Sequence, residues 1–175
     1  MDAIKAMLAR TSYRGKYEDK KIPKEDLIKI MEAGLAAPSG SNKQTVSLIA
    51  VDDELVLERL AEVCHPLKRQ PAPAIICILT KKIPAYKERL FNVQDYSAAI
   101  QNILIACVAL GYESCWYEGT VDDDDRQGLQ MASILGVPED YQLISYSPVG
   151  IALDEIKFPN KLTFEERAWF NGFEK

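Results

Sequence analysis

The chain has 175 residues, which is long enough for one domain with a buried core, and we expect residues 1–175 to form a single domain. Its composition, 47% hydrophobic and 27% charged, is that of a folded protein, and its formal net charge of -5 argues against nucleic-acid binding. No apolar run is long enough to cross a bilayer and no signal-peptide core begins the chain, so we expect a cytoplasmic protein that does not bind membranes.

In the first half of the chain, hydrophobic spacing predicts three helices and a strand. Apolar residues recur at helical spacing within 2–9, and again in the stretch that follows Pro23. Residues 38–42 favour a turn, which would end that second helix. The β-branched run 46–51 predicts a short buried strand, and we expect a third helix over 54–64.

The middle of the chain predicts the centre of the fold. The stretch 65–73 contains three prolines, so we predict a loop there. Residues 74–80 are apolar on both faces, which is typical of a central strand. A predicted helix over 97–110 is apolar nearly all round and must be covered on most sides, either by the fold or by a second subunit. Gly111 would end this helix.

The last third of the chain predicts two further strands, over 114–117 and 142–152, with a helix between them. That helix would begin at the acidic run 122–125, because carboxylates in a first helical turn interact favourably with the helix macrodipole, and it would end near residue 135. No other ligand group pairs with the acidic run, so we expect no metal site there. Residues 157–161 predict a loop.

The tail 163–173 is rich in aromatic residues. Trp169, Phe170 and Phe173 would be costly to expose to water, and in so short a chain a partner subunit is a reasonable place for them. The interleaved helices and strands indicate mixed α/β layers. Neither the GxGxxG nor the GxxxxGK[ST] nucleotide-binding motif is present, so a nucleotide-like cofactor would have to bind by another route.

The four cysteines form no Cys-x-x-Cys pair, and with a single histidine, His65, they cannot assemble a zinc site. Cys77 and Cys107 lie inside apolar runs. We therefore predict that both are reduced core residues.

Residues 10–14 could form an anion site. Arg10 and Arg14 stand four residues apart with the hydroxyls of Thr11 and Ser12 between them, and paired guanidinium donors match the oxygens of a phosphate. The alternative is a solvated basic loop at the end of a helix. The spacing alone leaves both interpretations open.

Residues 37–44 offer hydroxyl groups, two side-chain amides and a flexible glycine just after a helix. Such a loop can approach a planar heterocycle closely and form hydrogen bonds with its edge. Taken alone, the stretch is better explained as a plain helix-ending turn.

Together these segments resemble a known family. Arg-x-Ser-x-Arg at 10–14, followed by Ala-Pro-Ser-x-x-Asn-x-Gln at 37–44, is similar to the FMN-dependent nitroreductases. The resemblance continues with Asp-Tyr-Ser-Ala-Ala-Ile-Gln-Asn at 95–102, Trp-Tyr-Glu-Gly at 116–119 and Pro-Val-Gly at 148–150. Each landmark is weak alone, and their shared order along most of the chain makes the resemblance specific.

The resemblance implies an α+β fold with a mostly antiparallel central sheet flanked by helices, in an interlocked homodimer with FMN at each of two interface sites. It implies a ping-pong reaction in which NADH or NADPH passes electrons through flavin N5 to a small-molecule acceptor such as a nitroaromatic or a quinone. No catalytic side chain is expected beyond the groups that contact the flavin, because the cofactor carries the electron chemistry.

The resemblance also implies roles for individual residues. The FMN phosphate and ribityl end would be held by residues of two loops: Arg10, Thr11, Ser12, Arg14 and Lys161. The isoalloxazine or ribityl would be reached from the other subunit by residues of the 37–44 loop: Pro38, Ser39, Gly40, Asn42 and Gln44. The backbone of Glu118 and Gly119 would lie beside flavin N5, and His65 and Lys68 near the pyrimidine edge.

Several alternatives stay open at this point. Lys68 is also explained as a solvent-exposed lysine, and His65 as an ordinary loop histidine. The segment 81–94 is short and leaves little room for the helical insertion that often covers the substrate in this family. An FMN-binding carrier or sensor with little reductase turnover is therefore a second hypothesis, and a protein without cofactor is a third.

Overall fold

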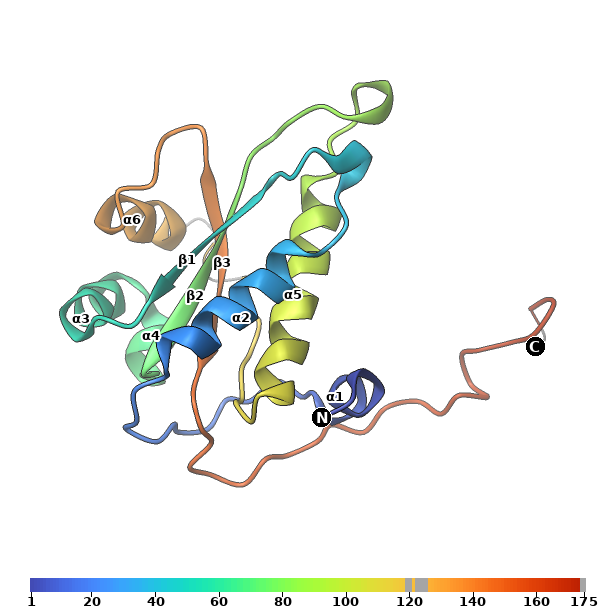
Figure 1. The fold of residues 1–175 in the computed structure, drawn as a ribbon, viewed down its shortest axis with the longest axis horizontal. Coiled ribbons are helices and arrows are strands. Elements are labelled where there is room, and N and C mark those ends of the chain that lie inside the picture. The colour runs from blue at the N-terminus through green and yellow to red at the C-terminus, as the bar shows by residue number, and fades with distance from the viewer. Residues whose placement is uncertain (119–120, 122–125, 174–175) are drawn as a thin grey trace.

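A three-stranded antiparallel sheet forms the centre of the protein. The computed structural model describes residues 1–118, 121 and 126–173 (Figure 1). The strands pair in the order β1-β2-β3, with β1 at Val46–Val51, β2 at Ala74–Thr80 and β3 at Gln142–Val149. The predicted antiparallel sheet and its central strand are confirmed. The last strand ends three residues earlier than predicted.

Alternating side chains of β2 enter two separate cores, one on each face of the sheet. Ile75, Cys77 and Leu79 belong to one core cluster, and Ala74, Ile76 and Ile78 belong to the other. All seven residues of β2 are buried. A strand that is buried on both faces loses the alternation of polar and apolar residues, which is why its sequence reads as one apolar run.

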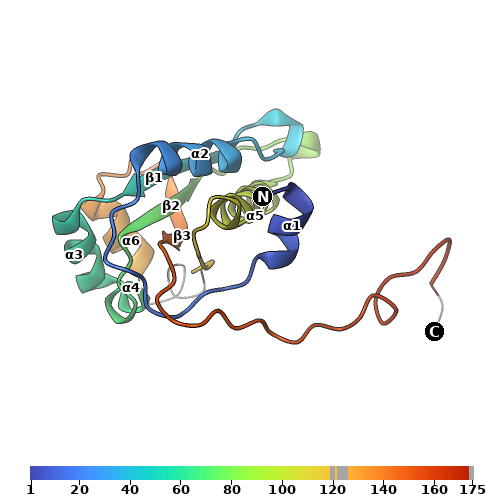
Figure 2. The ribbon, with the colours of Figure 1, turned by 60° about the horizontal axis from the view of Figure 1, so that its bottom comes forward.

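Helices cover both faces of the sheet (Figures 1 and 2). On one face lie α2, Lys24–Leu35, and the long α5, Asn92–Ala109. On the other face lie three shorter helices: α3 at Glu54–Val63, α4 at His65–Arg69 and α6 at Gln127–Ile134. The helix α1, Ala3–Ala9, packs against α5. Two short 3₁₀ turns, Gly40–Asn42 and Tyr86–Glu88, complete the described elements.

The stretch 65–73 is not entirely a loop, which corrects the sequence prediction. His65–Arg69 is helical, with Pro66 in its first turn. Proline is tolerated at that position because the backbone N–H groups of a first helical turn have no acceptor within the helix. The long helix also begins at Asn92, five residues before the predicted start at 97, and Gly111 ends it with a left-handed backbone (φ +88°) as predicted.

The predicted strand at 114–117 is wrong in extent. The segment pairs with its neighbours only through isolated bridges, Glu113 to Gly150 and Tyr117 to Tyr146. Between these bridges, the carbonyl of Ser114 accepts a hydrogen bond from the N–H of Tyr13 at 3.0 Å, so the backbone turns to the N-terminal loop instead of to β3. The acidic run 122–125 lies outside the described residues.

Both predictions for the cysteines are confirmed, since Cys77 and Cys107 are buried and reduced. The C-terminal segment runs away from the body of the protein (Figure 2). Its aromatic side chains are exposed in the single chain, with Phe170 at 78% and Phe173 at 72%. No helix of the described residues is long and apolar enough to span a membrane.

Candidate functional site

A cavity with a volume of about 630 Å³ lies beside the N-terminal loop, residues 10–16. Half of its lining consists of residues that the sequence placed at a phosphate: Arg10, Thr11, Ser12, Arg14 and Lys161. The other half was not expected and comes from α1 and from the loop after β3: Met7, Leu8, Lys157, Phe158 and Pro159. The structure thus brings both predicted cationic segments to one cavity.

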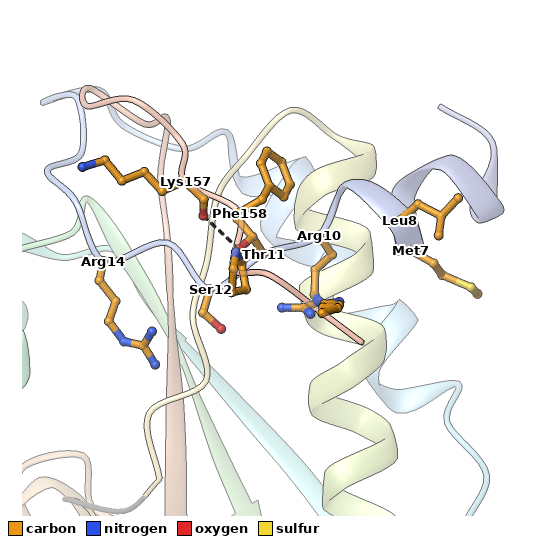
Figure 3. A pocket seen from close by; sticks show the side chains of 10 residues that line it. Met7, Leu8, Arg10, Thr11, Ser12, Arg14, Lys157 and Phe158 are labelled. Atoms are coloured by element: carbon orange, nitrogen blue, oxygen red, sulfur yellow. Dashed lines mark hydrogen bonds between the residues drawn. The ribbon is translucent and has the colours of Figure 1, made fainter. Parts of the chain in front are cut away.

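Three of these side chains point the same way because the loop is extended. The helix α1 ends at Ala9, and the next residue, Arg10, takes extended backbone angles (φ −63°, ψ 125°). In extended backbone alternate side chains share one side, and Figure 3 shows Arg10, Ser12 and Arg14 pointing to the same side of the loop. Thr11 faces the opposite way, and its hydroxyl donates to the carbonyl of Lys157 at 3.3 Å.

Tertiary hydrogen bonds fix this loop in place. The N–H of Lys16 donates to a carboxylate oxygen of Asp154 at 2.7 Å, and the N–H of Asp154 donates to the Tyr13 hydroxyl at 3.0 Å. The Tyr13 hydroxyl in turn donates to the carbonyl of Lys16. Together with the bond from Tyr13 to Ser114, these contacts hold the loop at both Ser114 and Asp154, so that the cationic side chains start from a defined backbone.

The arginines of this loop affect the pKa values of two neighbouring side chains, Cys115 and Tyr117. Burial raises the pKa of the Cys115 thiol, and the guanidinium groups of Arg14 and Arg10 oppose that rise. Burial likewise raises the pKa of Tyr117, again opposed by Arg14 and by Arg69. Several cations thus act on one small region of a chain with a net charge of -5, which makes the region favourable for an anionic group.

A second, smaller cavity of about 140 Å³ lies against the loop 38–45. Its lining includes three residues that the sequence placed at a planar cofactor, Pro38, Ser39 and Gln44, together with Thr45 and Asp95. Gly40 and Asn42 belong to the same loop, in the 3₁₀ turn Gly40–Asn42.

A buried carboxylate holds this loop. Asp95 is 3% exposed and accepts a hydrogen bond from the N–H of Gly40 at 2.8 Å and another from the hydroxyl of Thr45 at 2.7 Å. Within the loop, the hydroxyl of Ser39 accepts from the N–H of Gln44 at 2.9 Å.

The loops that line the two cavities lie near opposite ends of α5 (Figure 1). Asp95 and Ala99, close to the beginning of the helix, line the second cavity. The loop beside the first cavity is hydrogen-bonded to Ser114, which follows the end of the helix. The helix rises about 21 Å between Asp95 and Ala109. The two halves of the predicted flavin site are thus well separated within one chain.

The sequence of the chain matches a family model described as the Nitroreductase family over residues 7–73 and 68–151. The chain belongs to the nitroreductase family. A relative from Archaeoglobus fulgidus, named as an NADH dehydrogenase/NAD(P)H nitroreductase, is 33% identical over 159 residues, which cover 90% of this chain and 89% of the relative.

Solved structures of the nitroreductase family agree with this assignment. An FMN-dependent nitroreductase from Clostridium difficile is 29% identical with a TM-score of 0.80, and the match covers 97% of this chain and 99% of that one. A nitroreductase from Bacteroides fragilis, solved with bound FMN, is 25% identical with a TM-score of 0.76 over 98% of this chain and 100% of that one. The nitroreductase fold predicted from the sequence motifs is confirmed.

The remaining predicted residues of this nitroreductase-family chain come from two other segments, 118–119 and the helix α4. The carboxylate of Glu118 accepts a hydrogen bond from the hydroxyl of Tyr96 at 2.9 Å, and Gly119 lies outside the described residues. His65 and Lys68 are exposed on α4 and line neither of the two described cavities.

Two hydrogen bonds connect Gln70, at the end of α4, with Tyr117 and with the N-terminal loop. The Tyr117 hydroxyl donates to the side-chain carbonyl of Gln70 at 2.6 Å, and the amide of Gln70 donates to the carbonyl of Gly15 at 2.6 Å. The ring of Tyr117 stacks on that of Tyr146, with ring centres 5.1 Å apart. Tyr117, in the nitroreductase-family landmark, is therefore held by both Gln70 and Tyr146.

Some residues of the candidate site escaped the sequence analysis. Asp95 and Tyr96 stand in a recognised landmark, but nothing in the sequence shows what their side chains contact. Lys157 lies four residues before Lys161 in a lysine-flanked loop, which was a usable signal. Gln70 lies among prolines, where no periodicity could reveal it. Among the described residues, no group of three or more His, Cys, Asp or Glu side chains could hold a metal ion.

Proposed function

We propose that this protein is an FMN-dependent oxidoreductase that takes electrons from NADH or NADPH. The observation that carries the proposal is one cavity lined by Arg10, Ser12 and Arg14 from the N-terminal loop and by Lys161 from the loop after β3. Guanidinium groups offer paired donors that suit phosphate oxygens, and hydroxyls add short neutral donors. The donor set therefore fits the phosphate of FMN, the group that a relative of known structure binds.

A homodimer completes the proposed site. The loop 38–45 and the N-terminal loop lie near opposite ends of α5 (Figure 1), so a single chain would not bring both loops to one FMN. One FMN would instead be held by the N-terminal loop of one subunit and by five residues of the other: Pro38, Ser39, Gly40, Asn42 and Gln44. Exposed apolar side chains support the pairing of two chains. On α1 the exposed fraction is 65% for Ile4 and 78% for Leu8, and the aromatic tail is exposed as well.

The residues of the chain would bind and orient the cofactor. Arg10, Arg14 and Lys161 would neutralise the phosphate, the Glu118–Gly119 backbone would face flavin N5, and His65 and Lys68 would approach the pyrimidine edge. Bound FMN supplies the electron chemistry: a ping-pong transfer of hydride from NADH or NADPH through N5 to a small acceptor such as a nitroaromatic or a quinone. No dedicated acid or base side chain is needed.

The first experiment is an absorption spectrum of the purified protein, before and after addition of FMN, followed by anaerobic addition of NADH or NADPH. Flavin bands that bleach with the nicotinamide and return with a nitroaromatic or quinone are the expected result. Flavin bands that never bleach would favour the carrier or sensor hypothesis. A protein that takes up no flavin would refute the proposal, and a monomer by sedimentation in the presence of FMN would refute its shared site.

A further inference from the structure

The loop 38–45 adopts a backbone that its own residues do not favour. Ser41, Asn42 and Gln44 all have a left-handed backbone, with φ of +51°, +53° and +51°. Asparagine tolerates this region, but serine and glutamine seldom adopt it, and Ser41 and Gln44 persist in it only where the surrounding structure imposes it. Something outside the loop must therefore hold it.

The carboxylate of Asp95 holds the loop at both ends. One oxygen accepts from the N–H of Gly40, just before the left-handed residues, and the other accepts from the hydroxyl of Thr45, just after them. Packing adds to this restraint, because a Cβ atom on Gly40 would come within 2.7 Å of the Cβ of Phe91. The side chain of Asp95 thus bridges the two ends of the strained turn.

Asp95 is also unusual in its surroundings. Among the described residues it is the only buried Asp, Glu, Lys or Arg. It lies in the first turn of α5, where the helix macrodipole favours a negative charge, and both of its oxygens are hydrogen-bonded. A buried carboxylate is costly unless such partners compensate it. Its contacts with the loop are therefore what make its burial tolerable.

We propose that Asp95 is a positioning residue that acts through the loop 38–45, fixing the backbone and side chains with which this loop binds a flavin. The inference rests on the proposed function, because it needs the loop to contact the cofactor. Asp95 lines the same cavity as Ser39 and Gln44, so loss of its hydrogen bonds to the loop should move the other residues that line that cavity. Loss of either hydrogen bond should weaken binding of the ring and ribityl part of the flavin, and not of the phosphate.

Riboflavin lacks the phosphate of FMN, so comparing the affinities for the two ligands distinguishes contacts to the phosphate from contacts to the ring and ribityl chain. In Asp95→Asn and in Thr45→Val, we expect the dissociation constants of FMN and of riboflavin to rise by the same factor, about tenfold or more, since each variant weakens a hydrogen bond to a charged group. Thr45→Ser keeps the hydroxyl and should bind both ligands within about threefold of the unmodified chain. Fluorescence titration of purified, flavin-free protein measures all of these constants.

Asp26→Asn is the matched control. Asp26 is also in the first turn of a helix and also accepts two side-chain hydrogen bonds, from Lys29 at 2.9 Å and from Tyr112 at 2.8 Å, but it lies away from the loop 38–45. Asp26→Asn should lower thermal stability and leave both flavin affinities unchanged. All titrations are made well below the melting temperature of each variant. If Asp95→Asn does not fold, Thr45→Val, which removes a single hydroxyl, carries the test.

The outcomes separate this inference from the proposed function. An unmodified chain that binds neither FMN nor riboflavin would refute the function itself. An unmodified chain that binds FMN, with Thr45→Val binding both flavins equally tightly, would refute the role of Asp95 alone. A loss confined to FMN in the Asp95 and Thr45 variants would also refute it, because it would locate the effect at the phosphate.

Discussion

Replacing Arg14 by alanine tests the phosphate side of the proposed site. Arg14 points to the same side of the loop as Arg10 and Ser12, and it lines the cavity that Lys161 also lines (Figure 3). The side chain is exposed and the loop backbone is fixed by hydrogen bonds of Tyr13 and Lys16, so the substitution should leave the fold intact.

The size of the effect follows from the lost interaction. A hydrogen bond to a charged group contributes about 1.5–3 kcal/mol, which corresponds to roughly a 10- to 150-fold change in the dissociation constant. Arg14 is exposed, so water and salt screen its charge and place the expected loss in the lower part of that range, about 10- to 30-fold at 0.15 M salt.

The assay is a fluorescence titration with FMN and, separately, with riboflavin. Arg14→Ala should weaken FMN binding and leave riboflavin binding unchanged. Arg59→Ala is the control, since it removes the same charge from an exposed side chain of α3 that lines neither described cavity, and it should change FMN binding less than about threefold. Unchanged FMN affinity in Arg14→Ala, or an equal loss in the control, would refute a direct contact.

Three further predictions concern stability and reactivity. Gly34→Ala should destabilise the fold by about 1 kcal/mol although alanine is the better helix former, because its Cβ would lie 2.8 Å from Cγ1 of Ile103; thermal unfolding measures this, and a raised melting temperature would contradict it. The Lys29 ammonium and the Tyr112 hydroxyl lower the pKa of Asp26. This contributes stability above the unfolded carboxyl pKa of about 3.9 that is lost as pH falls through the folded pKa, so Asp26→Asn should flatten the acid limb of stability against pH. All four cysteine thiols are buried, with pKa values raised by burial, so a thiol reagent should label them only after unfolding; rapid labelling of the folded protein would show that the packing is wrong.

The sequence was sufficient where local patterns coincide with tertiary roles. The run 74–80 is apolar throughout because it is buried on both faces, so its pattern identified the central strand. Residues 10–14 were recognisable because an extended loop places alternate side chains on one side, and two arginines with a serine between them then form one donor group.

Other features could not be read from local patterns. The helix α4 was missed because proline normally argues against helix, and only the position of Pro66 in the first turn makes it acceptable. The start of α5 was missed because its first turn is polar, and its burial comes from contacts with the loop 38–45.

The sequence by itself thus determined the family and the three strands of the sheet, and it supplied the residues that we propose hold a phosphate. The tertiary structure alone decided that the two halves of the proposed flavin site lie near opposite ends of α5 (Figure 1). It also decided that Asp95 is hydrogen-bonded to both ends of the loop 38–45. The physical reason is distance along the chain. Helix and strand periodicity arise from neighbours within a few residues, whereas the bonds from Gly40 and Thr45 to Asp95 join groups 50 or more residues apart.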